Sequence, residues 1–437
     1  MKKYAVIPIF IPHQGCPHDC IFCNQKKITA HELLPTADEI RETLDIWLST
    51  LEDVPTVELA FYGGSFTAIP IEEQNLYLEA AKPFLSTDLC PPAEPNPYGT
   101  AQKDCLQSSP LCPPAAQHLG GTTKKDCSQS SPICSPADSH LDDMQPPRSQ
   151  SARKISAIRL STRPDYITPE ILENLKAHGV KTIELGVQSL DPEVLRLSGR
   201  GHDTACIYES ARMIKDYGFR LGIQLMIGLP GDTLEKCIYS ARETVKLAPS
   251  IARLYPTVVM PDTVLYDQYL RGEYTPLTEE EAILRTKEMY RILTAADIQI
   301  IRVGLKSSHV IGGVGGAVPG TYFPAFRQLV EGSLARDALQ AQLAALGFHP
   351  IDAAAADAPA ADSAGRPSGS LVTFPAAGTP AAAPKVDLYS NPRCFSNMVG
   401  NSNRNRLFFE AHYPYLNLRF RTDPTLKNEE HLVRIVD

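Results

Sequence analysis

The amino-acid sequence predicts an α/β protein whose strands and helices form a partial barrel. Six apolar, β-branched runs alternate with helix-like stretches, which is typical of parallel β/α units with strands buried on both faces. A polar cluster follows each of the first five runs, at the carboxyl ends of the strands, where barrels of the TIM type carry their chemistry. These observations favour a partial TIM-type (β/α)6 barrel.

The predicted barrel repeats one order of elements: a strand, a polar cluster and a helix. Several of the helix-like stretches begin on Thr or Asp and two end on Gly, as helix caps do. The expected strands are 5–11, 56–62, 157–162, 182–187, 221–229 and 252–260. The clusters after the first five strands are a cysteine loop, GGSFT, STRPDY, QSLD and GLPGD.

Two segments have compositions that do not suit a packed core. The segment 88–153 contains tandem copies with a period of 22 residues and almost no large apolar side chains, so we expect a disordered insertion. Its cysteines take their regular spacing from the repeat, which makes that spacing poor support for a second metal site. The second segment, 352–384, is an Ala/Pro-rich linker. The predicted domains are a core barrel over 1–87 and 154–330, the insertion 88–153, a connecting helix over 331–351, the linker 352–384, and a small basic α+β module over 385–437.

Composition narrows the class of protein. The net charge of -8 gives no global attraction to nucleic acid, so an RNA site would have to be a local basic patch. The apolar run near the start is short and broken by Pro8 and Pro12, and no stretch approaches the roughly 20 apolar residues that span a bilayer. We therefore expect a cytoplasmic protein without membrane contact. In that compartment the 11 cysteines are more consistent with metal or cluster ligands than with disulfides.

The loop CPHDCIFC places three thiols, Cys16, Cys20 and Cys23, close together after the first strand. Three thiolates can hold Zn²⁺ or three irons of an iron–sulfur cluster. Structural zinc normally takes four protein ligands, and the fourth here would be His13, His18 or a distant cysteine. Three ligands alone would leave one iron open, able to chelate a small molecule and pass it an electron. The residues by themselves leave both possibilities open.

The C-x3-C-x2-C spacing, with Phe22 before the third cysteine, resembles the cluster loop of radical S-adenosylmethionine (SAM) enzymes. The stretches FYGGSFTAIP, STRPDY, ELGVQS, GIQLMIGLPGDT and RLYPTVV resemble the catalytic subunit of Elongator and its shorter bacterial relatives. Apart from the insertions, the resemblance covers roughly residues 3–330. It implies the partial barrel of the radical SAM type.

The resemblance also implies the cofactors. Cys16, Cys20 and Cys23 would ligate a [4Fe-4S] cluster, and the amino and carboxylate groups of SAM would chelate the fourth iron. Reduction of the cluster, by a donor such as flavodoxin or ferredoxin, would cleave SAM to methionine and a 5′-deoxyadenosyl radical that abstracts hydrogen from the substrate.

The resemblance carries a set of SAM-pocket candidates onto this chain. Gly63 and Gly64 remove side-chain bulk where backbone would approach the methionine moiety. Two alternatives remain. Arg163 with Asp165, or Glu184 alone, would form a structural ion pair. On the fifth strand, Gln224 and Met226 would fill the barrel core. The candidates are Phe22, Gly63, Gly64, Ser65, Phe66, Ser161, Arg163, Glu184, Gln188, Gln224 and Met226. His202, in SGRGHD, is a further candidate that would face the substrate.

The residues after position 330 limit what the resemblance implies about the substrate. About 107 residues follow position 330, part of them linker, which is too few for the acetyltransferase domain of the Elongator subunit. From Arg393 to Arg421 there are five arginines against one glutamate, a local charge of +4, and Arg404 and Arg406 could contact phosphates. A small basic cap packed on the barrel is the alternative.

The function expected is radical SAM modification of RNA, in particular tRNA. One alternative is a radical SAM enzyme acting on a small molecule such as a porphyrin precursor, as in oxygen-independent coproporphyrinogen dehydrogenases. Another is a non-catalytic iron–sulfur or zinc protein that binds RNA or a partner. The polar groups at the strand ends disfavour this last reading, because an inert scaffold does not need them.

Overall fold

The computed structural model describes residues 4–11, 20–23, 35–51, 53–86, 155–305, 311, 316–351 and 383–436. Three sequence predictions fall outside these residues: Cys16 with His13 and His18, the insertion 88–153, and the linker 352–384 except for its last two positions. The rest of the chain carries the predicted barrel and the C-terminal module.

The larger sheet has seven strands, all parallel, in the sequential order β1 to β7. Its strands are β1 Tyr4–Ile11, β2 Thr56–Gly63, β3 Ala157–Thr162, β4 Val180–Gln188, β5 Arg220–Ile227, β6 Ile251–Pro256 and β7 Gln299–Val303. The predicted α/β class and all six predicted strands are confirmed. The structure adds β7 at the edge. It also ends β6 at Pro256, because the apolar residues Val258–Met260 continue as buried loop rather than as strand.

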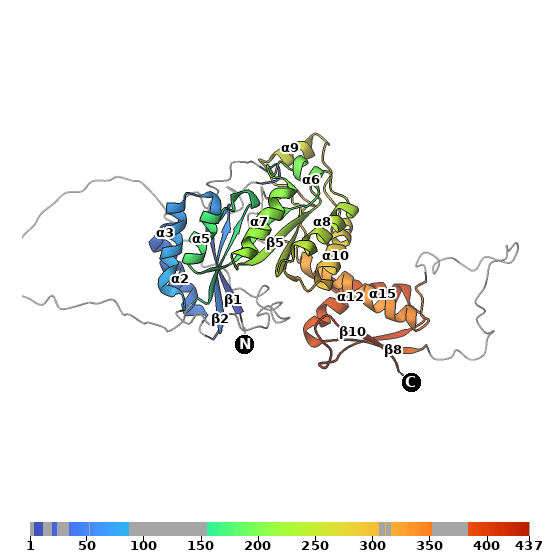
Figure 1. Cartoon of the computed structure of the whole chain (residues 1–437). Helices are drawn as coiled ribbons and strands as arrows, with labels where there is room; N and C mark the ends of the chain where they lie inside the picture. The colour runs from blue at the N-terminus through green and yellow to red at the C-terminus, as the bar shows by residue number, and fades with distance from the viewer. Residues whose placement is uncertain are drawn as a thin grey trace, which may run out of the picture.

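Helices follow the strands as the sequence predicts, and Thr and Asp side chains cap them. Thr36 and Glu39 form a capping box at the start of α2, and Thr168, Asp203 and Thr233 cap later helices. The helices of this part are α2 Ala37–Thr50, α3 Ile71–Ala81, α5 Pro169–Ala177, α6 Pro192–Leu197, α7 Thr204–Asp216, α8 Leu234–Leu247, α9 Val264–Leu270, α10 Glu279–Ala295 and α12 Phe326–Ala345. In Figure 1 the helices α2, α3, α5, α7, α8 and α10 flank the strands, whereas α9 lies beyond them at the top of the view and α12 leads to the C-terminal part.

The sheet is curled into a half-barrel. Tyr62 on β2 and Arg253 on β6 are four strands apart, about 19 Å in a flat sheet. The Arg253 guanidinium nevertheless lies 4.7 Å from the centre of the Tyr62 ring. The convex face buries Ile7, Leu59 and similar residues under the helices, in one core that runs through the whole sheet. The concave face carries the polar side chains.

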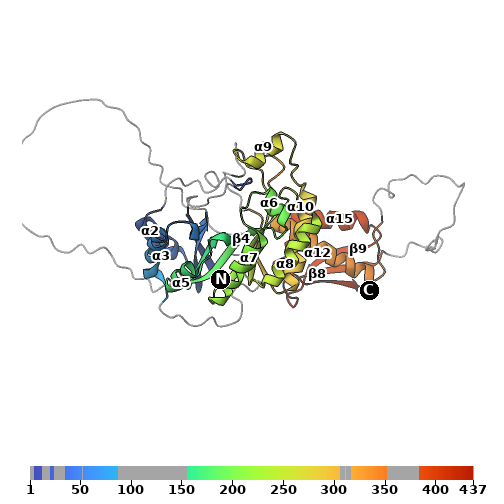
Figure 2. The same ribbon diagram turned by 45° about the horizontal axis from the view of Figure 1, so that its top comes forward.

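A second, three-stranded sheet forms the C-terminal part, in the order β10–β8–β9. Its elements are β8 Lys385–Ser390, α14 Phe395–Val399, α15 Arg404–His412, β9 Asn417–Thr422 and β10 His431–Val436. The apolar face of this sheet packs with the end of α12 and with α15 around Phe409 and Tyr413. Both views show this small sheet beyond α12 (Figures 1 and 2). In the described parts of the chain, no helix combines the length and apolarity needed to cross a membrane.

Candidate cofactor site at the carboxyl end of the sheet

The described part of the cysteine loop, residues 20–23, is fixed by backbone hydrogen bonds from both sides. Ile21 N–H donates to Ser198 O at 3.2 Å, and Leu265 N–H donates to Ile21 O at 2.8 Å. Cys23 N–H donates to Cys20 O at 2.9 Å, which brings the two cysteines into one turn. Phe22, a pocket candidate, packs with Ile21 against a cluster of Val259, Leu265 and Tyr274. The loop is therefore seated between the end of α6 and the start of α9.

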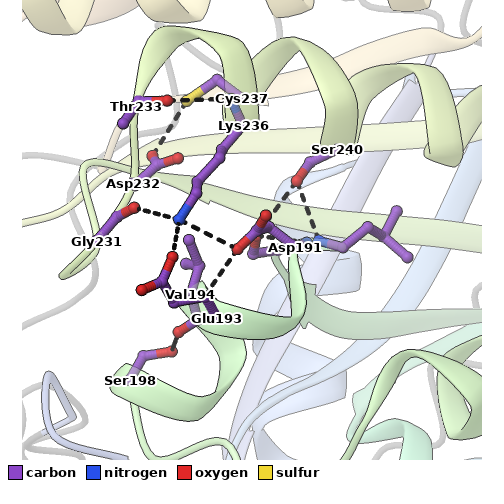
Figure 3. A network of polar contacts seen from close by, with 12 residues as sticks. Asp191, Glu193, Val194, Ser198, Gly231, Asp232, Thr233, Lys236, Cys237 and Ser240 are labelled. Carbon is purple, nitrogen blue, oxygen red and sulfur yellow. Dashed lines mark hydrogen bonds and ion pairs between the residues drawn. The ribbon is translucent and has the colours of Figure 1, made fainter.

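A polar network holds the α6 segment that supports the loop (Figure 3). Asp191 caps α6 by accepting from Val194 N–H at 3.0 Å. Lys236 on α8 reaches across to Glu193 and donates to Gly231 O at 2.9 Å. At the far end of α6, Ser198 donates to Val194 O at 2.5 Å. These contacts fix the backbone that presents the carbonyl of Ser198 to the cysteine loop.

Two buried arginines surround the Cys20 sulfur. Arg200 Nη1 donates to Cys20 Sγ at 3.1 Å, and Arg163 Nη1 lies 3.6 Å from the same sulfur. Arg200 also donates to Gly186 O, and Arg163 donates to Arg200 O at 2.5 Å. Guanidinium donors stabilise negative charge on sulfur, and the thiolate is the form that ligates metals. Sequence reasoning named Arg163 but missed Arg200, whose only signal was its place in SGRGHD.

Arg163 is oriented by an acidic side chain. Its Nε and Nη2 donate to the two oxygens of Asp165 at 2.9 and 2.8 Å, as the ion-pair alternative predicted. Burial would raise the pKa of Asp165, but the Arg163 hydrogen bonds hold that pKa below its ordinary value. His202 lies 3.7 Å from Asp165, with a side chain only 1% exposed, and burial together with Arg200 lowers its pKa to about 3. His202 is therefore a neutral, buried side chain beside this pair, and its role toward a substrate stays a prediction.

The glycine pair at the end of β2 lies directly against the backbone of Ile11 on β1. Gly63 has φ +110°, and a Cβ there would lie 2.3 Å from Ile11 O. Gly64 N–H donates to Ile11 O at 3.1 Å, so this donor, which the sequence offered to SAM, is already used. Ser65 and Phe66 are buried, and the Phe66 ring lies 5.0 Å from Phe61 in the core. At residue 63 the chain requires glycine.

The remaining pocket candidates occupy the concave face. Ser161, Gln224 and Met226 are partly exposed between fully buried strand neighbours. Gln188 ends β4 at a bulge, buried and with φ 68°. Glu184 is buried in ion pairs with Arg159 and Arg253, at 3.1 and 2.5 Å. For Glu184, the structure therefore shows the ion pairs that were the alternative to a contact with SAM.

The donor set of the loop fits a sulfur-ligated cluster. Cys20 and Cys23 share one turn, and two guanidinium groups lie within 3.6 Å of the Cys20 sulfur. Among the described residues no group of three or more His, Cys, Asp or Glu side chains could hold a metal ion, and Cys16 is outside those residues.

The predicted RNA contacts of the C-terminal module have partners within the protein. Arg404 Nη1 forms an ion pair with Glu279 of α10 at 2.5 Å, and the Arg406 guanidinium lies 5.2 Å from the Phe420 ring centre. Asn405 is buried and donates to Gly332 O at 2.7 Å. The Arg404 and Asn405 contacts dock the module on α10 and α12, as the cap alternative predicted, and the Arg406 contact lies within the module.

Known proteins resemble both halves of the barrel. The model of the radical SAM superfamily matches residues 140–243, and that of the Radical_SAM C-terminal domain matches residues 249–336. The tRNA uridine(34) acetyltransferase of Methanocaldococcus jannaschii is 27% identical over 302 residues, which cover 64% of this chain and 47% of that protein. Elongator complex protein 3 of Bos taurus is 33% identical over 137 residues, which cover 31% of this chain and 25% of that protein. The chain thus spans less than half the length of these relatives.

A solved structure agrees in fold. The archaeal Methanocaldococcus infernus Elp3 with an N-terminal deletion aligns with a TM-score of 0.50 and 21% identity, covering 78% of this chain and 64% of that one. The matched superfamily region contains strands β3 to β5 of the parallel sheet, and the matched C-terminal domain contains β6 and β7. The chain therefore contains the two domains of a radical SAM enzyme and is similar to Elongator-type proteins.

Proposed function

We propose that this enzyme binds a [4Fe-4S] cluster through Cys16, Cys20 and Cys23, binds SAM beside it, and modifies RNA, in particular tRNA. The observation that carries the proposal is the Cys20 sulfur held between Arg163 and Arg200 at the carboxyl end of the curled sheet. When bound and reduced, such a cluster supplies the electron that cleaves SAM and provides a 5′-deoxyadenosyl radical. Flavodoxin or ferredoxin is the proposed class of electron donor.

The chain's own residues prepare this site. The two arginines approach the Cys20 sulfur, and Asp165 fixes Arg163 through two hydrogen bonds. Ile21 is held at both its N–H and its C=O, which fixes residues 20–23 against the end of α6 and the start of α9. The concave face, with Ser161, Gln224 and Met226 partly exposed, offers donors, acceptors and an apolar surface for the nucleoside of SAM.

The proposal of tRNA rests on the relatives and on the C-terminal module. Three of the similar proteins are named tRNA uridine(34) acetyltransferase, but the aligned regions cover only 24%, 47% and 26% of them. The acetyl transfer in that name is therefore not part of the proposal. On the module, Arg406 and Arg421 remain partly exposed although both have intramolecular partners, so a phosphate backbone can reach them.

The first test is SAM cleavage. The full-length chain, reconstituted anaerobically with iron and sulfide, should convert SAM to 5′-deoxyadenosine when dithionite is added. Cys20→Ala should abolish both the cluster absorbance and the product. Cys237→Ala is the matched control, because Cys237 is buried like Cys20 but lies on α8, and it should leave both unchanged. A protein that takes up only zinc, or a Cys20→Ala variant that still cleaves SAM, would overturn the proposal.

The second test is binding of tRNA. Gel retardation of the full-length chain should show a complex whose affinity falls with salt, since phosphate contacts release counterions. Arg421→Gln should weaken the complex, while Arg271→Gln, which changes an exposed arginine paired with Glu273, should not. Equal binding by both variants would argue against the module as the RNA site. Absence of any complex, together with intact SAM cleavage, would favour a small-molecule substrate.

A further inference from the structure

The concave face of the half-barrel has an apolar floor and a charged layer above it. At the amino ends of the strands, Tyr4, Ile251 and Ile301 pack together with Val6 and close the interior. Above this floor, side chains of β2, β3, β4 and β6 form one chain of ion pairs from Glu58 to Arg253.

Two carboxylates, Glu58 and Glu184, carry the negative charge of this layer. Glu58 accepts from Arg159 Nε at 2.6 Å and from the Tyr4 hydroxyl at 2.8 Å. Glu184 pairs with Arg159 at 3.1 Å on one side and with Arg253 at 2.5 Å on the other. Glu58 also interacts electrostatically with Arg220 on β5, so the two carboxylates already compensate three guanidinium groups and neither is left for a further cation.

A further cation is present. Arg302 on β7 is the direct cross-strand neighbour of Arg253 on β6. It is partly buried, its Nε donates to Gly304 O at 3.1 Å, and no carboxylate lies within ion-pair distance of it among the residues that the structure describes. Burial lowers the pKa of Arg302, and the neighbouring Arg253 and Arg327 act in the same direction. Like charges directly opposite each other destabilise a sheet, and a desolvated cation without a counter-ion costs further free energy.

Two tyrosine hydroxyls lie beside this excess charge. Arg253 donates to the Tyr255 hydroxyl at 3.3 Å and to the Tyr62 hydroxyl. Because each hydroxyl accepts a hydrogen bond from Arg253, each keeps its own proton to donate elsewhere. Burial raises the pKa of Tyr62, so that proton is retained at neutral pH. Both side chains, like Arg302, are only partly buried.

We propose that Arg302, with Arg253 and the hydroxyls of Tyr62 and Tyr255, forms a binding site for an oxyanion of the substrate, a phosphate or a carboxylate, in the interior of the half-barrel. A planar guanidinium with two terminal nitrogens matches the oxygen pairs of either group. The inference deepens the proposed function, because it names the chemical group by which a substrate of this enzyme is held within the half-barrel.

The test is anion-dependent stability of the full-length chain. Thermal unfolding is measured at constant ionic strength with sodium phosphate, sodium acetate or sodium chloride, for the wild type, Arg302→Gln, Arg302→Lys and the surface control Arg271→Gln. Phosphate or acetate should raise the unfolding temperature of the wild type and the control above the chloride value. In Arg302→Gln the fitted dissociation constant should rise about tenfold or more, since hydrogen bonds to a charged group are lost. Arg302→Lys, which keeps the charge, should retain part of the effect.

The phosphate and acetate titrations distinguish the two kinds of oxyanion, and the chloride measurement distinguishes lost anion binding from lost stability. A larger shift with phosphate indicates a phosphorylated or nucleic-acid substrate, and a larger shift with acetate indicates a carboxylic acid. In chloride, Arg302→Gln should be at least as stable as the wild type, because it removes an uncompensated cation. Equal anion shifts in wild type and Arg302→Gln, or a marked loss of stability in chloride, would overturn the inference. The titration requires neither cluster nor SAM, so its failure is distinguishable from failure of the radical chemistry.

Discussion

Replacing Arg159 by methionine should destabilise the half-barrel strongly. The Arg159 side chain is 2% exposed and joins Glu58 at 2.6 Å to Glu184 at 3.1 Å. Methionine fills a similar elongated volume but carries no charge, so the change removes the electrostatic partner with little loss of packing. Glu184 would keep Arg253, whereas Glu58 would keep the Tyr4 hydroxyl and lose the guanidinium group.

The expected cost follows from this asymmetry. Removing one partner of a buried ion pair costs about 3–5 kcal/mol, because a buried charge is left uncompensated. Glu58, with a side chain 6% exposed, would lose its ion pair with Arg159, although Arg220 still interacts with it electrostatically. For a domain of this size each kcal/mol lowers the unfolding temperature by about 2–4 °C, so we expect a fall of roughly 6–20 °C.

The assay is urea unfolding of the full-length chain. The single tryptophan, Trp47 on α2, packs against the barrel core and reports on it by fluorescence. The matched variant is Glu58→Gln combined with Arg159→Met, which removes both charges and should recover most of the loss. If Arg159→Met alone were as stable as the wild type, or the double variant as unstable as Arg159→Met, the compensation of Glu58 by Arg159 would be refuted. The oxyanion inference would lose its basis with it.

Three further predictions concern single residues. The pKa of His202 in the folded protein lies below its value in the unfolded chain, so the free energy of unfolding should fall as the pH decreases below about 6.5. The expected loss is about 2 kcal/mol between pH 7 and pH 5. In a pH series of unfolding curves, this loss should largely disappear in His202→Asn. Burial raises the pKa of the Cys206 thiol to about 11, so alkylation by iodoacetamide, followed by peptide mass spectrometry, should be slow at pH 8 and speed up towards pH 10; fast labelling at pH 8 would contradict this. Gly63→Ala should lower the unfolding free energy by about 1–3 kcal/mol more than Gly218→Ala. Both glycines have positive φ, but only a Cβ at residue 63 would meet backbone, at Ile11 O. Equal losses in the two variants would show that this clash is relieved.

Local sequence signals predicted most of the fold. Alternating apolar runs and helix caps such as Thr36 and Asp203 fixed the order of the parallel units, because each signal acts within a few residues. The edge strand β7 gave a weaker signal, since its five residues include Gln299 and Arg302, whose polar side chains face the interior. Period and capping therefore suffice for the units, and they fail where a strand is short and polar.

The candidate site was predictable only in part. The Arg163–Asp165 pair is local in sequence and was anticipated, whereas the contact of Arg200 with Cys20 joins residues 180 positions apart. The charged layer of the half-barrel was invisible for the same reason, because Glu58 and Arg159 stand singly within apolar strands and become partners only when the strands align. Long-range charge compensation requires the register of the sheet, which no local pattern contains.

Helix α12 sets how far the C-terminal module can reach. Its 20 residues extend about 30 Å. Near its start the Phe326 side chain packs so closely on Gly304 that no Cβ fits there, and its far end packs into the core of the small sheet. Midway, the Glu331 carboxylate accepts from Arg327 and from Asn397 at 2.8 Å each. Bending α12 would expose this buried charge. We therefore expect the helix to hold the C-terminal module at a constant distance from the edge strand β7, which carries Arg302.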